Sequence, residues 1–107
     1  MMTFLNLKEV KEREMVPGFR ARMVHSDNMT FAFWQIDAGA ALPAHSHPHE
    51  QVFTLLEGEF ELTVGDEMRV NKPGAVAVIP PNVPHAGRAL TDCRVIDVFH
   101  PTRDDYR

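Results

Sequence analysis

Eight prolines and six glycines interrupt the chain at short intervals, and this restricts its fold more than any other feature. Few of the segments between them are long enough for an ordinary helix, because proline removes a backbone donor and glycine favours turns. Most segments instead alternate apolar and polar residues or are rich in β-branched and aromatic residues, as strands are. The predicted strands lie within residues 19–26, 29–37, 50–58, 59–67, 75–80 and 93–100. Regular short strands separated by turns predict an all-β sandwich or barrel.

Some local details are less uniform. Residues 7–15, LKEVKEREM, have a helical composition and form either a short helix or a strand that leads into the Pro-Gly pair at 17–18. The Gly-Asp pair at 65–66 lies between alternating segments and predicts a hairpin turn. The Pro-Pro pair at 80–81 ends an apolar strand and brings His85 just past a turn.

Length and composition fit one globular domain spanning residues 1–107, with 44% apolar and 24% charged residues. The net charge of −4 and the scattered basic residues argue against nucleic-acid binding. No apolar run approaches the roughly 20 residues that cross a bilayer, and the N-terminus becomes charged too early for a signal peptide. The single cysteine, Cys93, allows no internal disulfide and lies in an alternating apolar stretch, which favours a packed thiol over a nucleophile. We therefore expect a cytoplasmic protein that binds no membrane.

Three histidines occupy every second position in PAHSHPHEQ, residues 43–51. Alternate residues of a strand share a face, so His45, His47 and Gln51 point the same way, although the proline between them argues against a continuous strand. A distant turn can bring His85 to the same place. Imidazoles that share an interior need a partner, because an unpaired buried polar group costs about 1–3 kcal/mol. Neutral imidazole is the commonest ligand of divalent transition metals, which predicts a metal site.

The other histidines, His25, His49 and His100, are expected to have no metal role. The neighbouring acid, Glu50, has the opposite parity to Gln51 and should point to solvent or to a nearby loop.

The two histidine segments carry a family resemblance. Residues 39–58, GAALPAHSHPHEQVFTLLEG, resemble the first cupin motif, and residues 74–85, GAVAVIPPNVPH, resemble the second. The resemblance covers most of the chain and implies a double-stranded β-helix, the cupin or jelly-roll barrel, with a metal inside. The implied metal ligands are His45, His47, Gln51 and His85.

Departures from the family pattern leave all of these ligands in place. Gln51 stands where an acid is usual, Asn82 where glycine is common, and Ala89 where asparagine is common. An amide oxygen cancels none of the charge of a divalent ion, so the site should hold metal less tightly but act as a stronger Lewis acid toward an anionic substrate. The set also lacks the carboxylate of the two-histidine, one-carboxylate iron site, which argues against oxygen chemistry. Ni, Fe, Mn, Co and Zn all fit, and the sequence does not choose between them.

The end of the chain, RVIDVFHPTRDDYR, adds two candidate polar residues. Asp97 shares a face with Val95 and Phe99 and lies either in the interior, where burial would raise its pKa, or on the outer face. Arg103 either folds over the barrel mouth and binds a carboxylate with two parallel hydrogen bonds, or pairs with acidic neighbours in a solvated tail.

The ending DVFHPTRDDY, together with the metal motifs, resembles small cupins of pectin and alginate breakdown. That resemblance implies conversion of 4,5-unsaturated uronates to linear keto forms, with Asp97 and Arg103 catalytic and with Phe99 and Arg103 binding the substrate, a small anionic sugar acid. The alternatives are a cupin dioxygenase, a non-enzymatic sugar-binding module and a metal-independent isomerase. The family also implies a homodimer, in which residues 2–10 are a candidate exchanged strand.

Overall fold

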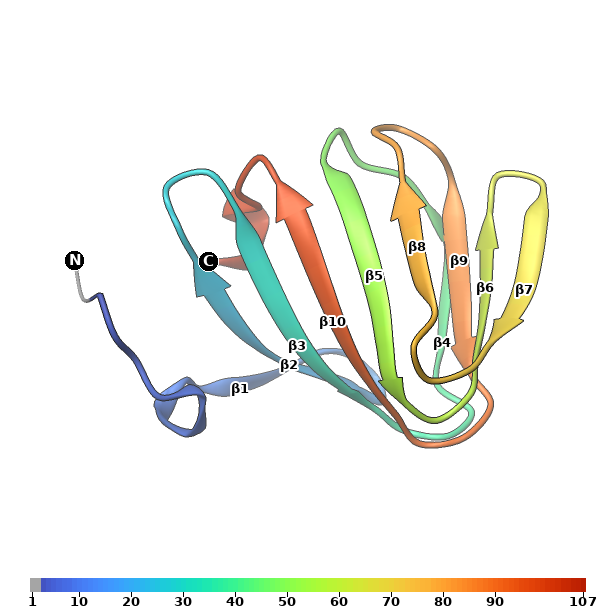
Figure 1. Ribbon diagram of the computed structural model, residues 1–107, viewed down its shortest axis with the longest axis horizontal. Helices are drawn as coiled ribbons and strands as arrows, with labels where there is room; N and C mark the ends of the chain where they lie inside the picture. The colour runs from blue at the N-terminus through green and yellow to red at the C-terminus, as the bar shows by residue number, and fades with distance from the viewer. Residues whose placement is uncertain (1–2) are drawn as a thin grey trace.

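Two antiparallel β-sheets face each other in this computed structural model, which describes residues 3–107 (Figure 1). The larger sheet has the strand order β1 (Glu12–Val16), β2 (Phe19–His25), β3 (Thr30–Ile36), β10 (Cys93–His100), β5 (Glu50–Glu57), β8 (Val76–Ile79). The smaller sheet has the order β4 (Ala41–His45), β9 (His85–Ala89), β6 (Phe60–Val64), β7 (Glu67–Asn71). Two short 3-10 helices, η1 (Leu7–Glu9) and η2 (Asp104–Tyr106), lie near the ends of the described chain. The predicted all-β fold is confirmed.

Each of the six predicted strand segments contains a strand, and the hairpin between β6 and β7 turns at residues 65–66 as expected. Residues 7–15 combine both expected alternatives, because they hold η1 and most of β1. The sequence did not reveal β4 and β9. Strand β4 contains a proline, and β9 (HAGRA) lacks β-branched residues, so β4 depends on pairing with β9, and β9 on pairing with both β4 and β6.

Strand β10 is central in the larger sheet, with β3 on one side and β5 on the other. Val95, Asp97 and Phe99 all face the interior and are buried, so the outer-face alternative for Asp97 is wrong. The register pairs Val95 with Trp34 of β3 and Phe99 with Gln51 of β5. Diagonal neighbours on one face of a sheet come within reach of long side chains. Trp34 and Gln51 therefore flank Asp97 from the two neighbouring strands.

Apolar side chains from both sheets fill most of the space between them. The rings of Phe53 and Phe60 meet across the sheets with centroids 5.4 Å apart, and Phe19 packs edge-on against Trp34 at 5.9 Å. Each fully buried side chain of this size stabilises the fold by about 1.5–3 kcal/mol.

The turn between β5 and β6 depends on Gly58, which has a φ of +89°. A Cβ atom there would lie 2.2 Å from the backbone oxygen of Asp92. The neighbouring Cys93 is a buried free thiol, as predicted. None of the helices within residues 3–107 is long and apolar enough to cross a membrane.

The tail after β10, residues 101–107, is hydrogen-bonded to the larger sheet. The backbone N–H of Arg103 donates to Thr30 Oγ1 at 2.9 Å. Arg13 of β1 donates from Nη1 to the backbone oxygen of Tyr106 at 2.7 Å. These bonds fix the backbone just before η2 and at its last residue, so the tail holds its side chains in place.

Candidate metal and substrate site

Three histidines meet between the sheets, as the sequence predicted. His45 ends β4 and His85 begins β9, and the two residues pair directly across these strands, whereas His47 lies in the loop that follows β4. The ring centroids are 4.3 Å apart for His45 and His85, and 4.9 Å apart for His47 and His85. One nitrogen from each ring can be chosen so that all three lie within 4.8 Å of one another. These three histidines could hold a metal ion.

Backbone carbonyl groups set the orientation of each ring. Nδ1 lies 3.0 Å from Pro43 O in His45, 3.0 Å from His49 O in His47, and 2.9 Å from Val83 O in His85. A carbonyl oxygen only accepts, so each Nδ1 carries the hydrogen and each neutral ring keeps its lone pair on Nε2. Metal-binding histidines commonly have such a partner on the other ring nitrogen.

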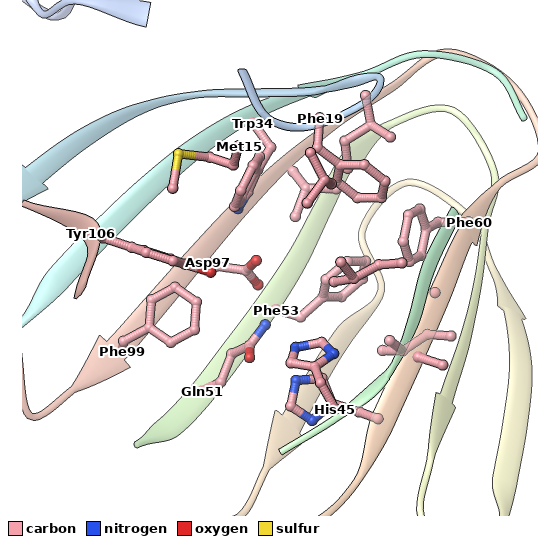
Figure 2. Close-up of a pocket in the computed structure, with 18 of the residues that line it drawn as sticks. Met15, Phe19, Trp34, His45, Gln51, Phe53, Phe60, Asp97, Phe99 and Tyr106 are labelled. Atoms are coloured by element: carbon pink, nitrogen blue, oxygen red, sulfur yellow. The ribbon is translucent and has the colours of Figure 1, made fainter. Parts of the chain in front are cut away.

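The lone pairs of His47 and His85 lack donors among residues 3–107. His85 Nε2 is buried and has no hydrogen-bond partner among residues 3–107. His47 Nε2 lies 3.1 Å from Gln51 Oε1, so two acceptors face each other when Nδ1 of His47 carries the hydrogen. The opposite amide orientation would turn the oxygen of Gln51 toward Asp97, where Figure 2 shows its nitrogen. A cation among these atoms would satisfy all of them, so the donor set fits a divalent transition metal.

The electrostatics keep the buried rings neutral. Burial lowers the pKa of His47 to about 4, with the charges of Arg103 and His85 acting in the same direction. Burial also lowers the pKa of His85. Neutral imidazoles need lose no proton before they bind a metal.

Asp97 lies deeper in the same interior and is 7% exposed. Burial raises the pKa of its carboxyl group to about 7, and polar contacts with Gln51 and Trp34 and the charge of Arg103 oppose the shift. Figure 2 shows Asp97 between the nitrogen of Trp34 and the amide of Gln51, with the hydroxyl end of Tyr106 nearby. A bound cation would also oppose the rise in pKa.

Arg103 combines the two arrangements expected of it. It is 8% exposed, yet its guanidinium also binds Asp105, through Nε at 3.2 Å and Nη2 at 2.6 Å. The group is stacked over the ring of Tyr106 at 3.9 Å and lies 4.9 Å from the ring centroid of Phe99. Guanidinium has five N–H donors, so Nη1 remains for a bound carboxylate.

Most of these groups line one pocket, whose empty space of about 640 Å³ includes open solvent at its mouth. Its polar lining consists of His45, Gln51, His85, Asp97 and Arg103, and the rest is mainly aromatic and aliphatic (Figure 2). The polar groups are few and converge from both sheets, as in binding sites for small molecules.

Phe99 is buried and lines the pocket, whereas Glu50 is exposed, as its parity indicated. His25, His49 and His100 lie outside the three-histidine cluster. The sequence analysis missed Trp34 and Tyr106. Their aromatic side chains suggested only packing, but the register of β3 beside Asp97 could have drawn attention to Trp34.

The sequence pattern of the cupin domain matches residues 32–99, which include both histidine segments and most of β10. The chain belongs to the cupin family. The predicted family and the predicted double-stranded β-helix are thereby confirmed.

Three relatives illustrate how similar this cupin is to known proteins. The structure of KdgF from Halomonas sp. is 30% identical, with a TM-score of 0.92 and 100% of both chains covered. An RmlC-like cupin from Shewanella frigidimarina is 27% identical, with a TM-score of 0.94, and the match covers 100% of this chain and 97% of that one. An L-ectoine synthase from Nocardia farcinica is 32% identical over 97 residues, covering 84% of this chain and 74% of the synthase.

Proposed function

We propose that this cupin is a metal-dependent isomerase that opens a 4,5-unsaturated uronate to its linear keto acid. The observation that carries the proposal is the joint burial of Asp97 and Arg103 beside the three-histidine cluster, in one pocket open to solvent. The proposed metal ligands are His45, His47, Gln51 and His85.

Arg103 binds the carboxylate of the substrate. Its Nη1 and the second hydrogen of Nη2 face away from the pair with Asp105. They can donate two parallel hydrogen bonds to a carboxylate. The stacked ring of Tyr106 and the nearby ring of Phe99 hold the guanidinium plane, so little freedom is lost on binding.

Asp97 moves the proton. Its carboxylate removes the proton from the hydroxyl group on C1, the C1=O bond forms, and the bond from C1 to the ring oxygen breaks. The ring oxygen becomes an enolate oxygen on C5, and the proton returns to C4 to give the 5-keto acid. A divalent ion held by the histidines would act as a Lewis acid toward the oxygen that becomes negative. No electrons are gained or lost, so no redox cofactor is required.

Two findings support the choice of substrate. The chain resembles the cupins of pectin and alginate breakdown through its metal motifs and its DVFHPTRDDY ending. Its fold also matches KdgF from Halomonas sp. over the whole length of both chains.

The test follows the absorbance of the conjugated unsaturated acid while metal-loaded protein acts on unsaturated galacturonate. Wild type should remove the absorbance, and Asp97→Asn and Arg103→Met should each lower kcat/KM at least about a hundredfold. Arg94→Ala is the matched control, because Arg94 is exposed on β10, the strand that carries Asp97. This variant should have the activity of wild type. An unchanged absorbance with wild type would end the isomerase proposal, and equal rates for all four proteins would end the site assignment.

The alternative functions give different results in the same assay. A cupin dioxygenase would consume oxygen during turnover, and a sugar-binding module would bind the uronate without forming product. A metal-independent isomerase would keep its activity after chelation.

We also propose that the protein is a cytoplasmic homodimer built from one domain per chain. Phe4 and Leu5 support the dimer, because they are 87% and 50% exposed on an arm that extends away from the sheets (Figure 1). Residues 3–10 form no strand within this chain, and Met2 lies outside the described residues, so strand exchange with a second copy stays a prediction. Light scattering of wild type and of Phe4→Ser should show a dimer that the substitution weakens, and monomeric wild type would refute it.

A further inference from the structure

Two buried polar atoms in the pocket have no hydrogen-bond partner among residues 3–107: Trp34 Nε1 and Asp97 Oδ1. The two residues are 8% and 7% exposed, so more than nine-tenths of each is buried. An unpaired buried donor or acceptor costs about 1–3 kcal/mol, and native proteins rarely leave such groups unpaired. The indole N–H lies near enough to the carboxyl group of Asp97 to lower its pKa, yet no well-formed hydrogen bond closes between the two atoms. A polar group bound between the two side chains would complete both.

The sheet register brings these side chains together. Trp34 pairs with Val95, which places its side chain diagonally next to Asp97 on the inner face. Figure 2 shows the indole nitrogen pointing toward the carboxyl group of Asp97 and the pocket between them and Gln51. Both residues line this pocket.

The two atoms have complementary hydrogen-bonding roles. Indole Nε1 only donates a hydrogen bond, whereas a carboxylate oxygen only accepts one. A hydroxyl group carries one donor and two acceptor lone pairs, so one hydroxyl can accept from Trp34 and donate to Asp97. We propose that Trp34 Nε1 and Asp97 Oδ1 form a subsite for the hydroxyl group on C2 or C3 of the substrate, while the second carboxylate oxygen of Asp97 takes the proton from the C1 hydroxyl. The inference rests on the proposed function and deepens it, because it assigns a hydroxyl to the uronate at this end of the pocket.

Other ligand groups fit this pair less well. A carboxylate would face the carboxylate of Asp97, and an ammonium group could not accept from the indole. An apolar group would leave both atoms unpaired. Met15 and Phe19 form apolar walls nearby, so they offer no competing partner (Figure 2). The carboxylate of the substrate is left for Arg103.

The test compares substrates that differ by one hydroxyl group. Wild type should prefer unsaturated galacturonate about tenfold or more over the analogue deoxygenated at C2 or at C3, because one of these loses the bridging hydroxyl. Trp34 is the one tryptophan of the chain, so global replacement of tryptophan by benzothienylalanine removes a single N–H group and keeps the ring shape. This protein and Trp34→Phe should lose most of the preference, while the rate with the deoxy analogue changes little.

The outcomes separate this inference from the proposed function. If wild type turns over the uronate and both deoxy analogues with similar kcat/KM, the hydroxyl subsite is overturned and the isomerase stands. The same conclusion follows if loss of the N–H lowers kcat/KM equally for all substrates. If wild type turns nothing over but calorimetry shows saturated galacturonate binding more tightly than its deoxy analogues in a manner that depends on the N–H, the isomerase fails and the subsite stands. Absence of both turnover and binding overturns both.

Discussion

Gln51 offers the sharpest test of the proposed site, because its amide contacts two different groups. Its oxygen lies 3.1 Å from His47 Nε2, and its nitrogen faces the buried Asp97 (Figure 2). Gln51→Glu keeps the shape but places a second carboxylate beside the first. At an effective dielectric constant near 20, two charges about 4 Å apart repel by about 4 kcal/mol. Proton uptake relieves part of this repulsion, so we expect a loss of about 2–4 kcal/mol of unfolding free energy without metal.

The same substitution should have the opposite effect on metal affinity. The added negative charge faces a divalent cation, so Gln51→Glu should bind metal at least about tenfold more tightly than wild type, a gain of about 1.4 kcal/mol. Urea denaturation with and without a divalent transition metal, and calorimetric titration of the ion, measure both effects. Gln35→Glu is the matched control, because Gln35 is exposed on β3 and should change neither quantity.

Metal-free Gln51→Glu with the same stability as wild type would show that Gln51 does not face Asp97. Unchanged metal affinity would show that residue 51 does not reach the ion.

Three further predictions concern packing and the tail. Gly58→Ala should lower the unfolding free energy by at least about 2 kcal/mol more than Gly74→Ala. Both glycines have a positive φ, but only a Cβ at residue 58 would meet backbone atoms. Equal urea midpoints for the two variants would contradict this prediction. Burial raises the pKa of the Cys93 thiol, so alkylation at pH 8 should be about a hundredfold slower in the native protein than in urea, and comparable rates would show an accessible thiol. Thr30→Val removes the acceptor of the Arg103 N–H and should cost about 1–3 kcal/mol by urea denaturation, together with lower isomerase activity; undiminished stability and activity would show that this bond does not hold the tail.

Much of the fold could be predicted because the strands of the larger sheet carry their own signals. β-branched and aromatic residues in short segments with turn residues at each end identify β3, β5 and β10 before any tertiary contact is known. Strands β4 and β9 lack such signals, and their extended backbone depends on pairing with each other and, for β9, with β6. Local propensity does not predict segments whose conformation is set by their neighbours.

The sequence determined which chemical groups this cupin has, and the spacing of its two histidine segments indicated that they meet. It also placed Asp97 on the face of Val95 and Phe99, because side chains alternate along a strand whatever its surroundings. Only the tertiary structure decided that this face is the interior, that Arg103 is buried while also paired with Asp105, and that Trp34 points an unpaired N–H toward Asp97. These facts depend on the register of β10 against β3 and β5 and on hydrogen bonds from distant residues to the tail. Such contacts join positions up to 93 residues apart, as between Arg13 and Tyr106, and local sequence patterns carry no information about them.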